Sequence, residues 1–214
     1  MIMRKTLCVC LILVLCLFAT GYAEEASVDA DTLFGTIENG AYENKYVGLG
    51  FKIDDWQILT DEDYERMREA TKALMPEEMQ QFKENAGILT VLRAKDLLNN
   101  AINIKIKYIA GSSEYTETDT KTLITSNIDD FQQWLRETGF ANAEAEYVST
   151  TIEGREYDGM LGSYDILTVN QHMYSRLIMF ICGEYMVIIT ASSVTEDRTE
   201  EICQRFYHLK DSEE

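Results

Sequence analysis

The chain has 214 residues and a formal net charge of −18, since 37 acidic residues stand against 19 basic ones. Its length suffices for one domain with a substantial hydrophobic core. So acidic a surface repels phosphate backbones and anionic lipid heads, and we therefore expect no nucleic acid among its partners. An acidic surface can also have solubility as its only role, so the net charge does not identify a function.

The first 23 residues have the pattern of a secretory signal peptide. A positively charged start precedes an uncharged, mostly apolar run from 7 to 19, which is too short for a comfortable membrane span. Small residues before Glu24 fit a signal-peptidase site, so cleavage is expected between Ala23 and Glu24. The sequence thus predicts a secreted or envelope-associated protein with no stable membrane span after cleavage.

Two alternatives to a cleaved signal stay open. The apolar run could persist as an anchor that tethers the protein to the envelope. Cys16 could instead carry a lipid, although Leu13, Val14 and Leu15 stand before it, where that processing requires small residues.

Two cysteines, Cys182 and Cys203, remain once the signal is removed. In an exported protein they could form one disulfide. Cys182 lies beside a predicted hairpin turn and Cys203 lies in the last predicted helix, so their Cα atoms are not expected within the roughly 7 Å that a bridge requires. Two buried thiols are the alternative.

The rest of the chain divides into three parts. Residues 24 to 40 are small, acidic and weakly patterned, and they are expected to form a flexible leader. A single domain is predicted from 41 to 210, followed by a tail at 211 to 214. We find no internal repeat, low-complexity tract or linker within the domain.

The domain is predicted to open with two short strands. A turn at 43 to 45 follows the first strand, and the second places Leu49, Phe51 and Ile53 on one face by alternation. Two aspartates end this strand, and Trp56 turns back toward the core.

Two helices and two strands are predicted next. Thr60 is placed to cap the first helix, and Pro76 suits the first position of a second helix that ends at Gly87. The strand at 88 to 94 is apolar on both faces, whereas the strand at 102 to 108 has one polar face.

The helix from about 118 to 138 has the clearest pattern, with apolar residues at helical spacing. Gly139 is placed for the left-handed cap position. Phe140 would then contact Leu135, as in a Schellman ending.

Four strands are predicted to follow as two hairpins, at 144–152 with 155–169 and at 173–182 with 185–193. Gly159 and Gly162 indicate a bulge or a close backbone approach. The second hairpin is apolar on both faces, so it is expected at the centre of the sheet.

A capping-box pattern at 193 to 196 predicts a final helix, whose buried residues would be Ile202, Cys203, Phe206 and Leu209. Helices and strands do not alternate in a βαβ rhythm, so a largely antiparallel sheet is indicated. Strands that are apolar on both faces need cover on both sides. The predicted fold class is therefore α+β, a single-domain helix–sheet–helix sandwich.

The opening segment from Tyr42 to Ile53, followed by Trp56, resembles small exported proteins of gut-dwelling Gram-positive anaerobic bacteria. Those proteins look like members of the PsbP-like fold group, which includes the photosystem II extrinsic subunit and the Ran-binding Mog proteins. The resemblance covers roughly 40 to 210. The usual pattern has proline and glycine before the tryptophan, where Asp54 and Asp55 stand here. The resemblance implies a binding or assembly module and no particular activity.

A search for reactive or metal-binding groups yields no candidate catalytic, cofactor or metal residue. His172 and His208 have no metal-ligand spacing to a second histidine or cysteine, and no cofactor is implied. A pair of Cys203 with His208 is conceivable, but the thiol is expected to face the core, where thiols are inert. The acidic pair Asp29 and Asp31 lacks the remainder of a calcium loop.

Other polar segments also provide no catalytic or phosphate-binding motif. The stretch from 111 to 113 lacks the glycines and lysine of a phosphate loop. Any two of 37 carboxyl groups could be proposed as a glycosidase pair, which is uninformative without geometry. Tyr46 and Tyr115 are candidates for exposed contacts with sugar or protein.

The sequence therefore favours a non-enzymatic binding or interaction module outside the cytoplasm, expected to be a monomer. Its ligand would be an unknown protein, a small molecule or a glycan. The alternative is a carboxylate-dependent hydrolase, which two buried acids with raised pKa would favour.

Overall fold

The computed structural model describes residues 33–60, 62, 88–109 and 119–210. The predicted signal peptide, most of the two helices expected between 60 and 87, the polar loop with Tyr115 and the tail lie outside these residues. Within the described part of the chain, no helix is long and apolar enough to cross a membrane.

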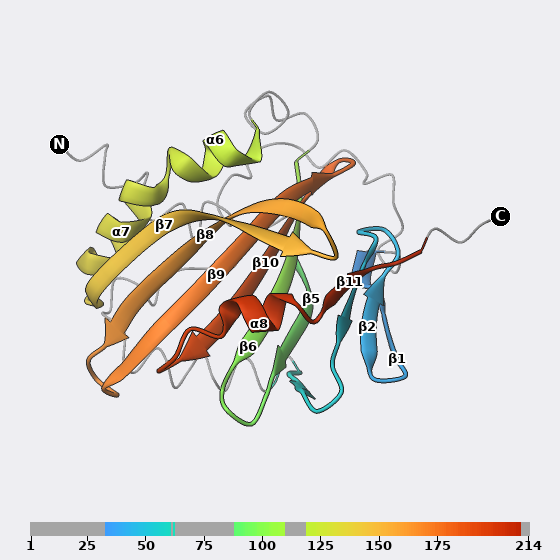
Figure 1. Ribbon diagram of the computed structural model, residues 1–214, viewed down its shortest axis with the longest axis horizontal. Helices are drawn as coiled ribbons and strands as arrows, with labels where there is room; N and C mark the ends of the chain where they lie inside the picture. Colours follow the sequence, from blue (N-terminus) through green and yellow to red (C-terminus); the bar gives the residue numbers. More distant parts are fainter. Residues whose placement is uncertain (1–32, 61, 63–87, 110–118, 211–214) are drawn as a thin grey trace.

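A large antiparallel sheet forms the middle of the domain (Figure 1). Its seven strands are, in spatial order, β4 (Gln57–Ile58), β5 (Ile88–Lys95), β6 (Ala101–Tyr108), β10 (Tyr185–Val194), β9 (Gln171–Cys182), β8 (Arg155–Ile166) and β7 (Ala141–Ile152). Every pairing between neighbours is antiparallel. The predicted hairpins and the central position of β10 are therefore confirmed.

Both hairpins turn where the sequence predicts, since Ile152 pairs with Arg155 and Cys182 pairs with Tyr185. In the second turn, Gly183 has a positive φ of 57°. Glu153 and Gly154 have φ values of 45° and 87°, the combination that a two-residue type I′ turn needs. The predicted close approach at Gly159 is also confirmed, since a Cβ there would lie 2.4 Å from the carbonyl oxygen of Leu177.

A second, smaller sheet was not predicted. It contains β1 (Thr36–Glu38), β2 (Ala41–Asn44), β3 (Leu49–Lys52) and β11 (Phe206–His208), in that order. Thr36–Glu38 pairs with Ala41–Glu43, and Leu33 is buried. The domain thus begins inside the predicted leader, whose last residues are structured.

The predicted long helix is two helices, α6 (Thr120–Thr125) and α7 (Ile128–Glu137). The side chain of Asn127 donates to the carbonyl oxygen of Leu123 at 2.7 Å, and this local bond competes with a continuous helix. The predicted ending is confirmed, because Gly139 has φ 90° and the Phe140 amide donates to the Leu135 carbonyl at 3.0 Å.

The final helix is shorter and starts later than predicted. Ser193 belongs to β10 rather than to a helix cap, and α8 spans only Thr199–Cys203. Phe206, which the prediction places on the helix, pairs with Phe51 in the small sheet. The edge of β3 supplies backbone partners that outweigh a helical pattern.

The two faces of the large sheet have different covers (Figure 1). One face packs against α6 and α7 through a core that includes Phe131, Trp134 and Met186. The other packs against the small sheet and α8 through a core that includes Phe51 and Ile189. The fold is a mixed, sheet-rich arrangement of two antiparallel sheets. Among the described residues, strands of the small sheet are the main cover of the second face, where the prediction places a helix layer.

Candidate functional site

A row of three residues crosses the outer face of the small sheet. Glu43 pairs with Gly50, and Gly50 pairs with Tyr207 on the next strand. Because Gly50 has no side chain, the Tyr207 ring lies directly over it; a Cβ at Gly50 would be 2.2 Å from the ring carbon Cζ. The Tyr207 hydroxyl reaches across the strand and donates to Glu43 Oε1 at 2.9 Å.

The Tyr207 hydroxyl is held in its protonated form. Burial, together with the hydrogen bond to Glu43 and the negative charge of that carboxylate, raises the pKa of Tyr207 to about 12. At neutral pH, Tyr207 is therefore a fixed donor to Glu43. The hydrogen bond between Tyr207 and Glu43 thus fixes the shape of this part of the sheet surface.

An open groove of about 570 Å³ lies over this row, a size within the roughly 300–1,000 Å³ typical of small-molecule sites. The groove is lined by residues of β2, the β2–β3 turn, β3, the β7–β8 turn, β11 and the segment after β11: Glu43, Lys45, Lys52, Glu153, Tyr207, His208, Leu209 and Lys210. Figure 1 shows these strands side by side at one end of the molecule.

Three ammonium groups surround the groove. Lys45, Lys52 and Lys210 make no ion pair within the described residues. By contrast, the carboxylates of the groove are already engaged: Glu43 accepts from Tyr207, and Glu153 Oε2 accepts from the backbone N–H of His208 at 2.7 Å. In a chain of charge −18, this local excess of uncommitted positive charge is unusual.

His208 borders the groove, and its ring is held by a stacking contact and a hydrogen bond. The ring stacks on Tyr157, with centroids 6.2 Å apart. Its Nε2 lies 3.1 Å from the carbonyl oxygen of Ile152, and since a carbonyl only accepts, Nε2 carries the proton. His208 thus contributes shape and a fixed orientation rather than a free base at Nε2.

His172 lies elsewhere, at the end of the β8–β9 hairpin. Its Nδ1 is 2.5 Å from Asp165 Oδ1, and the Asn142 side chain donates to the other oxygen of Asp165. The bond to His172 is the main reason why the pKa of Asp165 is lowered. Within the described residues, no three histidine, cysteine or acidic side chains are grouped to hold a metal ion.

Cys182 and Cys203 are free thiols, which answers the open question of a disulfide between them. Burial raises the pKa of the Cys203 thiol to about 12 and also raises that of Cys182. The two thiols are therefore poor nucleophiles at neutral pH. Cys203 ends α8 while His208 lies on β11, so the conceivable pair does not share a helix.

The predicted exposed contact at Tyr46 is wrong. Its side chain is half-buried, and its ring packs edge-on against Tyr185 with centroids 5.4 Å apart. Its hydroxyl points at the Cys182 carbonyl at 3.4 Å. Tyr115, the stretch 111–113 and the acidic pair near 30 lie outside the described residues.

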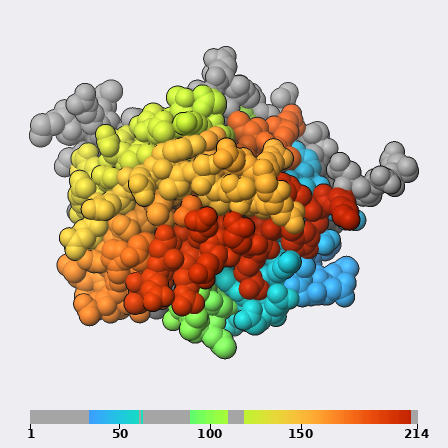
Figure 2. All heavy atoms as spheres, viewed as in Figure 1, coloured from blue at the N-terminus to red at the C-terminus, as the bar shows by residue number. Residues whose placement is uncertain are grey.

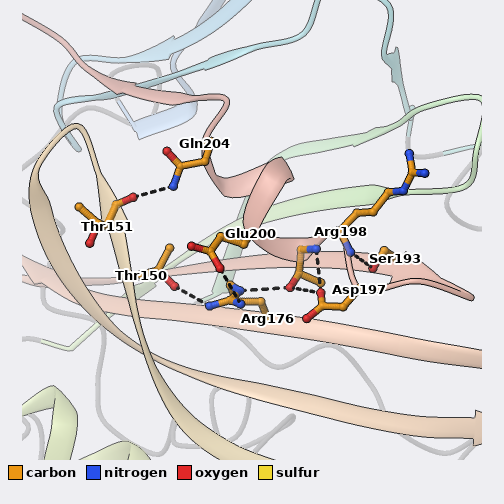
Figure 3. A network of polar contacts seen from close by, with 9 residues as sticks. Thr150, Thr151, Arg176, Ser193, Asp197, Arg198, Glu200 and Gln204 are labelled. Atoms are coloured by element: carbon orange, nitrogen blue, oxygen red, sulfur yellow. Dashed lines mark hydrogen bonds and ion pairs between the residues drawn. The ribbon is translucent and has the colours of Figure 1, made fainter.

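Sequence reasoning missed the buried guanidinium of Arg176 (Figure 3). It donates to Thr199 Oγ1 at 3.1 Å and to Thr150 Oγ1 at 3.2 Å, and it lies 3.7 Å from Glu200 Oε2. These contacts tie β9 to β7 and α8. The signal in the sequence was an arginine on the strand face that continues with Ile178 and Phe180. The network holds α8 against the large sheet.

The carboxyl groups give the hydrolase alternative no support. Among the described residues, Asp119 and Asp165 are the acids whose pKa is displaced, and both are displaced downward by hydrogen bonds. A general acid requires the opposite shift. No known protein-family model matches this chain, and a search of curated proteins finds no match.

Proposed function

We propose that the protein is a secreted or envelope-associated binding module, and that the groove over β2, β3 and β11 holds a small ligand with anionic groups. The observation that carries this proposal is the set of three lysines, Lys45, Lys52 and Lys210, which have no ion-pair partner in the described part of the chain. Carboxylate or phosphate groups are the ligands that ammonium groups bind.

The polar floor of the groove supports binding rather than catalysis. Tyr207 and Glu43 are bonded to each other, and Nε2 of His208 is bonded to a backbone carbonyl. Such groups orient a ligand, but none is poised as a nucleophile with an adjacent base. A polar or glycan-like ligand would replace water along this floor.

The proposed relationship to PsbP-like proteins belongs to the same proposal. Its support is the opening segment from Tyr42 to Trp56. Export rests on the signal pattern in the first 23 residues. Both fit a binding module that acts outside the cytoplasm.

Calorimetric titration with citrate, inorganic phosphate and digalacturonic acid tests the proposal. We expect at least one of these anions to bind, with an affinity that falls as salt rises from low to physiological concentration. The triple variant Lys45→Gln, Lys52→Gln, Lys210→Gln should bind about tenfold more weakly or worse, because each lost ammonium removes an attraction of up to about 1 kcal/mol.

The control is the double variant Lys95→Gln, Lys121→Gln, which removes two lysines that do not line the groove. This variant should bind like the wild type. Equal binding by the triple variant, or no binding by any anion, would refute the proposed site.

A further inference from the structure

The outer edge of β7 is the longest strand edge that the large sheet presents. The strand spans 12 residues, Ala141–Ile152, and β8 is its only strand neighbour in the described chain. Ile152 and Arg155 flank the two-residue turn as a directly bonded pair. Counting back from Ile152, even-numbered residues direct their backbone N–H and C=O groups to β8, and odd-numbered residues direct theirs outward.

Side chains from α7 and from the residue after α8 cover the two ends of this edge. Arg136 Nη2 donates to the carbonyl oxygen of Ala143 at 3.0 Å, and Gln132 Nε2 donates to that of Ala145 at 2.8 Å. These two side chains belong to α7.

At the other end, Gln204, just beyond α8, donates to the carbonyl oxygen of Thr151 at 3.0 Å (Figure 3). Such side-chain caps occupy the acceptors that a new strand would need. They therefore limit how much of the edge a partner strand can use.

Among the described residues, none caps the middle of the edge in this way. The outward backbone groups of Tyr147 and Ser149 make no backbone hydrogen bond within the described residues. In the space-filling view, β7 forms an uncovered yellow band between the helices α6 and α7 and the red C-terminal segment (Figure 2). A partner strand can therefore pair with residues 146 to 150 without displacing any cap.

The side chains beside this window define the partner's chemistry. Glu144 and Glu146 are exposed on one side of the strand. On the other side lies the Tyr147 ring, with the Lys121 ammonium 5.0 Å from its centroid. An added strand would thus place basic side chains beside the glutamates and apolar ones beside the ring, away from the lysine.

We infer that residues 146–150 of β7 bind a short, extended, basic segment of a partner protein by sheet augmentation, with basic and apolar side chains in alternation. Backbone hydrogen bonds from Tyr147 and Ser149 hold the partner segment as an added strand. Glu144 and Glu146 favour basic side chains in that segment. This surface is separate from the groove of the small sheet. A negative result at one of the two sites therefore leaves the proposal for the other unaffected.

A peptide titration followed by amide NMR tests this inference. The probe is an acetylated and amidated pentapeptide, Lys-Val-Lys-Val-Lys, added to the ¹⁵N-labelled protein. We expect the amide signals of Tyr147 and Ser149 to shift most, and those of Glu146, Val148 and Thr150 to shift less, because only the odd-numbered amides face the added strand. A matched peptide with glutamate in place of lysine should cause no shift.

Two variants at one position separate backbone from side-chain recognition. Ser149→Ala should keep peptide binding, because the backbone carries it. Ser149→Pro removes the outward N–H and should abolish binding, yet proline is tolerated on the open side of an edge strand. Unchanged amide signals from β9 and β10 would verify its fold.

Equal peptide binding by Ser149→Pro, or shifts confined to regions other than β7, would overturn the inference. Concentration-dependent dimers of the unliganded protein that Ser149→Pro dissolves would also overturn it, since the occupant would then be a second copy of this chain.

Discussion

Arg176 on β9 and Thr199 on α8 are joined by a hydrogen bond of 3.1 Å between the guanidinium Nε and the threonine hydroxyl, and both residues are buried. Thr199 in turn donates to Asp197 at 2.6 Å. The short helix α8 has only five residues, too few to be stable alone. Its position therefore depends on this buried contact.

Arg176→Ala should lower the free energy of unfolding by about 2–4 kcal/mol, because it leaves the hydroxyls of Thr150 and Thr199 without their buried donor. Urea denaturation measures the change. Arg198→Ala is the control, since Arg198 pairs with Glu196 at the exposed surface, where such pairs contribute about 0–1 kcal/mol. Equal effects of the two substitutions would show that the Arg176 network adds nothing.

Gly50→Ala should displace the Tyr207 ring, since the new methyl group would meet it at 2.2 Å. The bond to Glu43 would be lost, and the pKa of Tyr207 would fall from about 12 toward its ordinary value of 10.0. Spectrophotometric titration of tyrosine, with Tyr207→Phe to identify the signal, measures this. In the double variant with Tyr207→Ala, the added methyl group should be tolerated; a titration curve unchanged by Gly50→Ala would contradict the stacking.

Stability should fall in alkali between pH 10 and 12. The pKa values of Tyr42, Tyr147 and Tyr207 are raised to about 12 in the folded protein, against an ordinary value of 10.0. In this window the unfolded chain releases protons that the folded chain keeps, so unfolding becomes easier as pH rises. Well below pH 10 these tyrosines stay protonated in both states and contribute no pH dependence.

Urea midpoints from pH 8 to 11 measure the decline. Tyr207→Phe should make it shallower, because one contributor is removed. A variant with the same slope as the wild type would contradict the raised pKa of Tyr207.

The two thiols should react with a disulfide reagent at very different rates in the folded and unfolded states. Cys203 is fully buried, and burial raises its pKa to about 12, so little thiolate exists at pH 8. We expect Cys203 not to react with the reagent in the native protein, and both thiols to react quickly in denaturant. Cys182→Ala isolates the Cys203 signal; fast native reaction of that variant would mean that α8 opens readily.

Local patterns predicted the two hairpins of the large sheet and the end of α7 well. The turns at Glu153 and Gly183 and the ending at Gly139 depend on residues adjacent in the chain, so their geometry is visible in sequence. The central hairpin likewise follows from strands that are apolar on both faces.

The sequence was a poor guide wherever a short segment depends on distant partners. Ile202, Cys203, Phe206 and Leu209 have helical spacing, yet β11 forms because β3 offers an open edge. Three residues are too few to show strand alternation. The candidate groove escaped prediction for the same reason, since Lys45, Lys52 and Lys210 come together only through strand pairing.

The pairing of β11 with β3 also sets the order of assembly. Arg205 Nε donates to the Lys52 carbonyl across a separation of 153 positions, and contacts between such distant segments close slowly because chain entropy must be lost first. The small sheet is thus expected to be a late-folding unit, completed after the seven-stranded sheet gives it a surface. A nascent chain that lacks its last ten described residues would have no groove, so ligand binding would report complete folding.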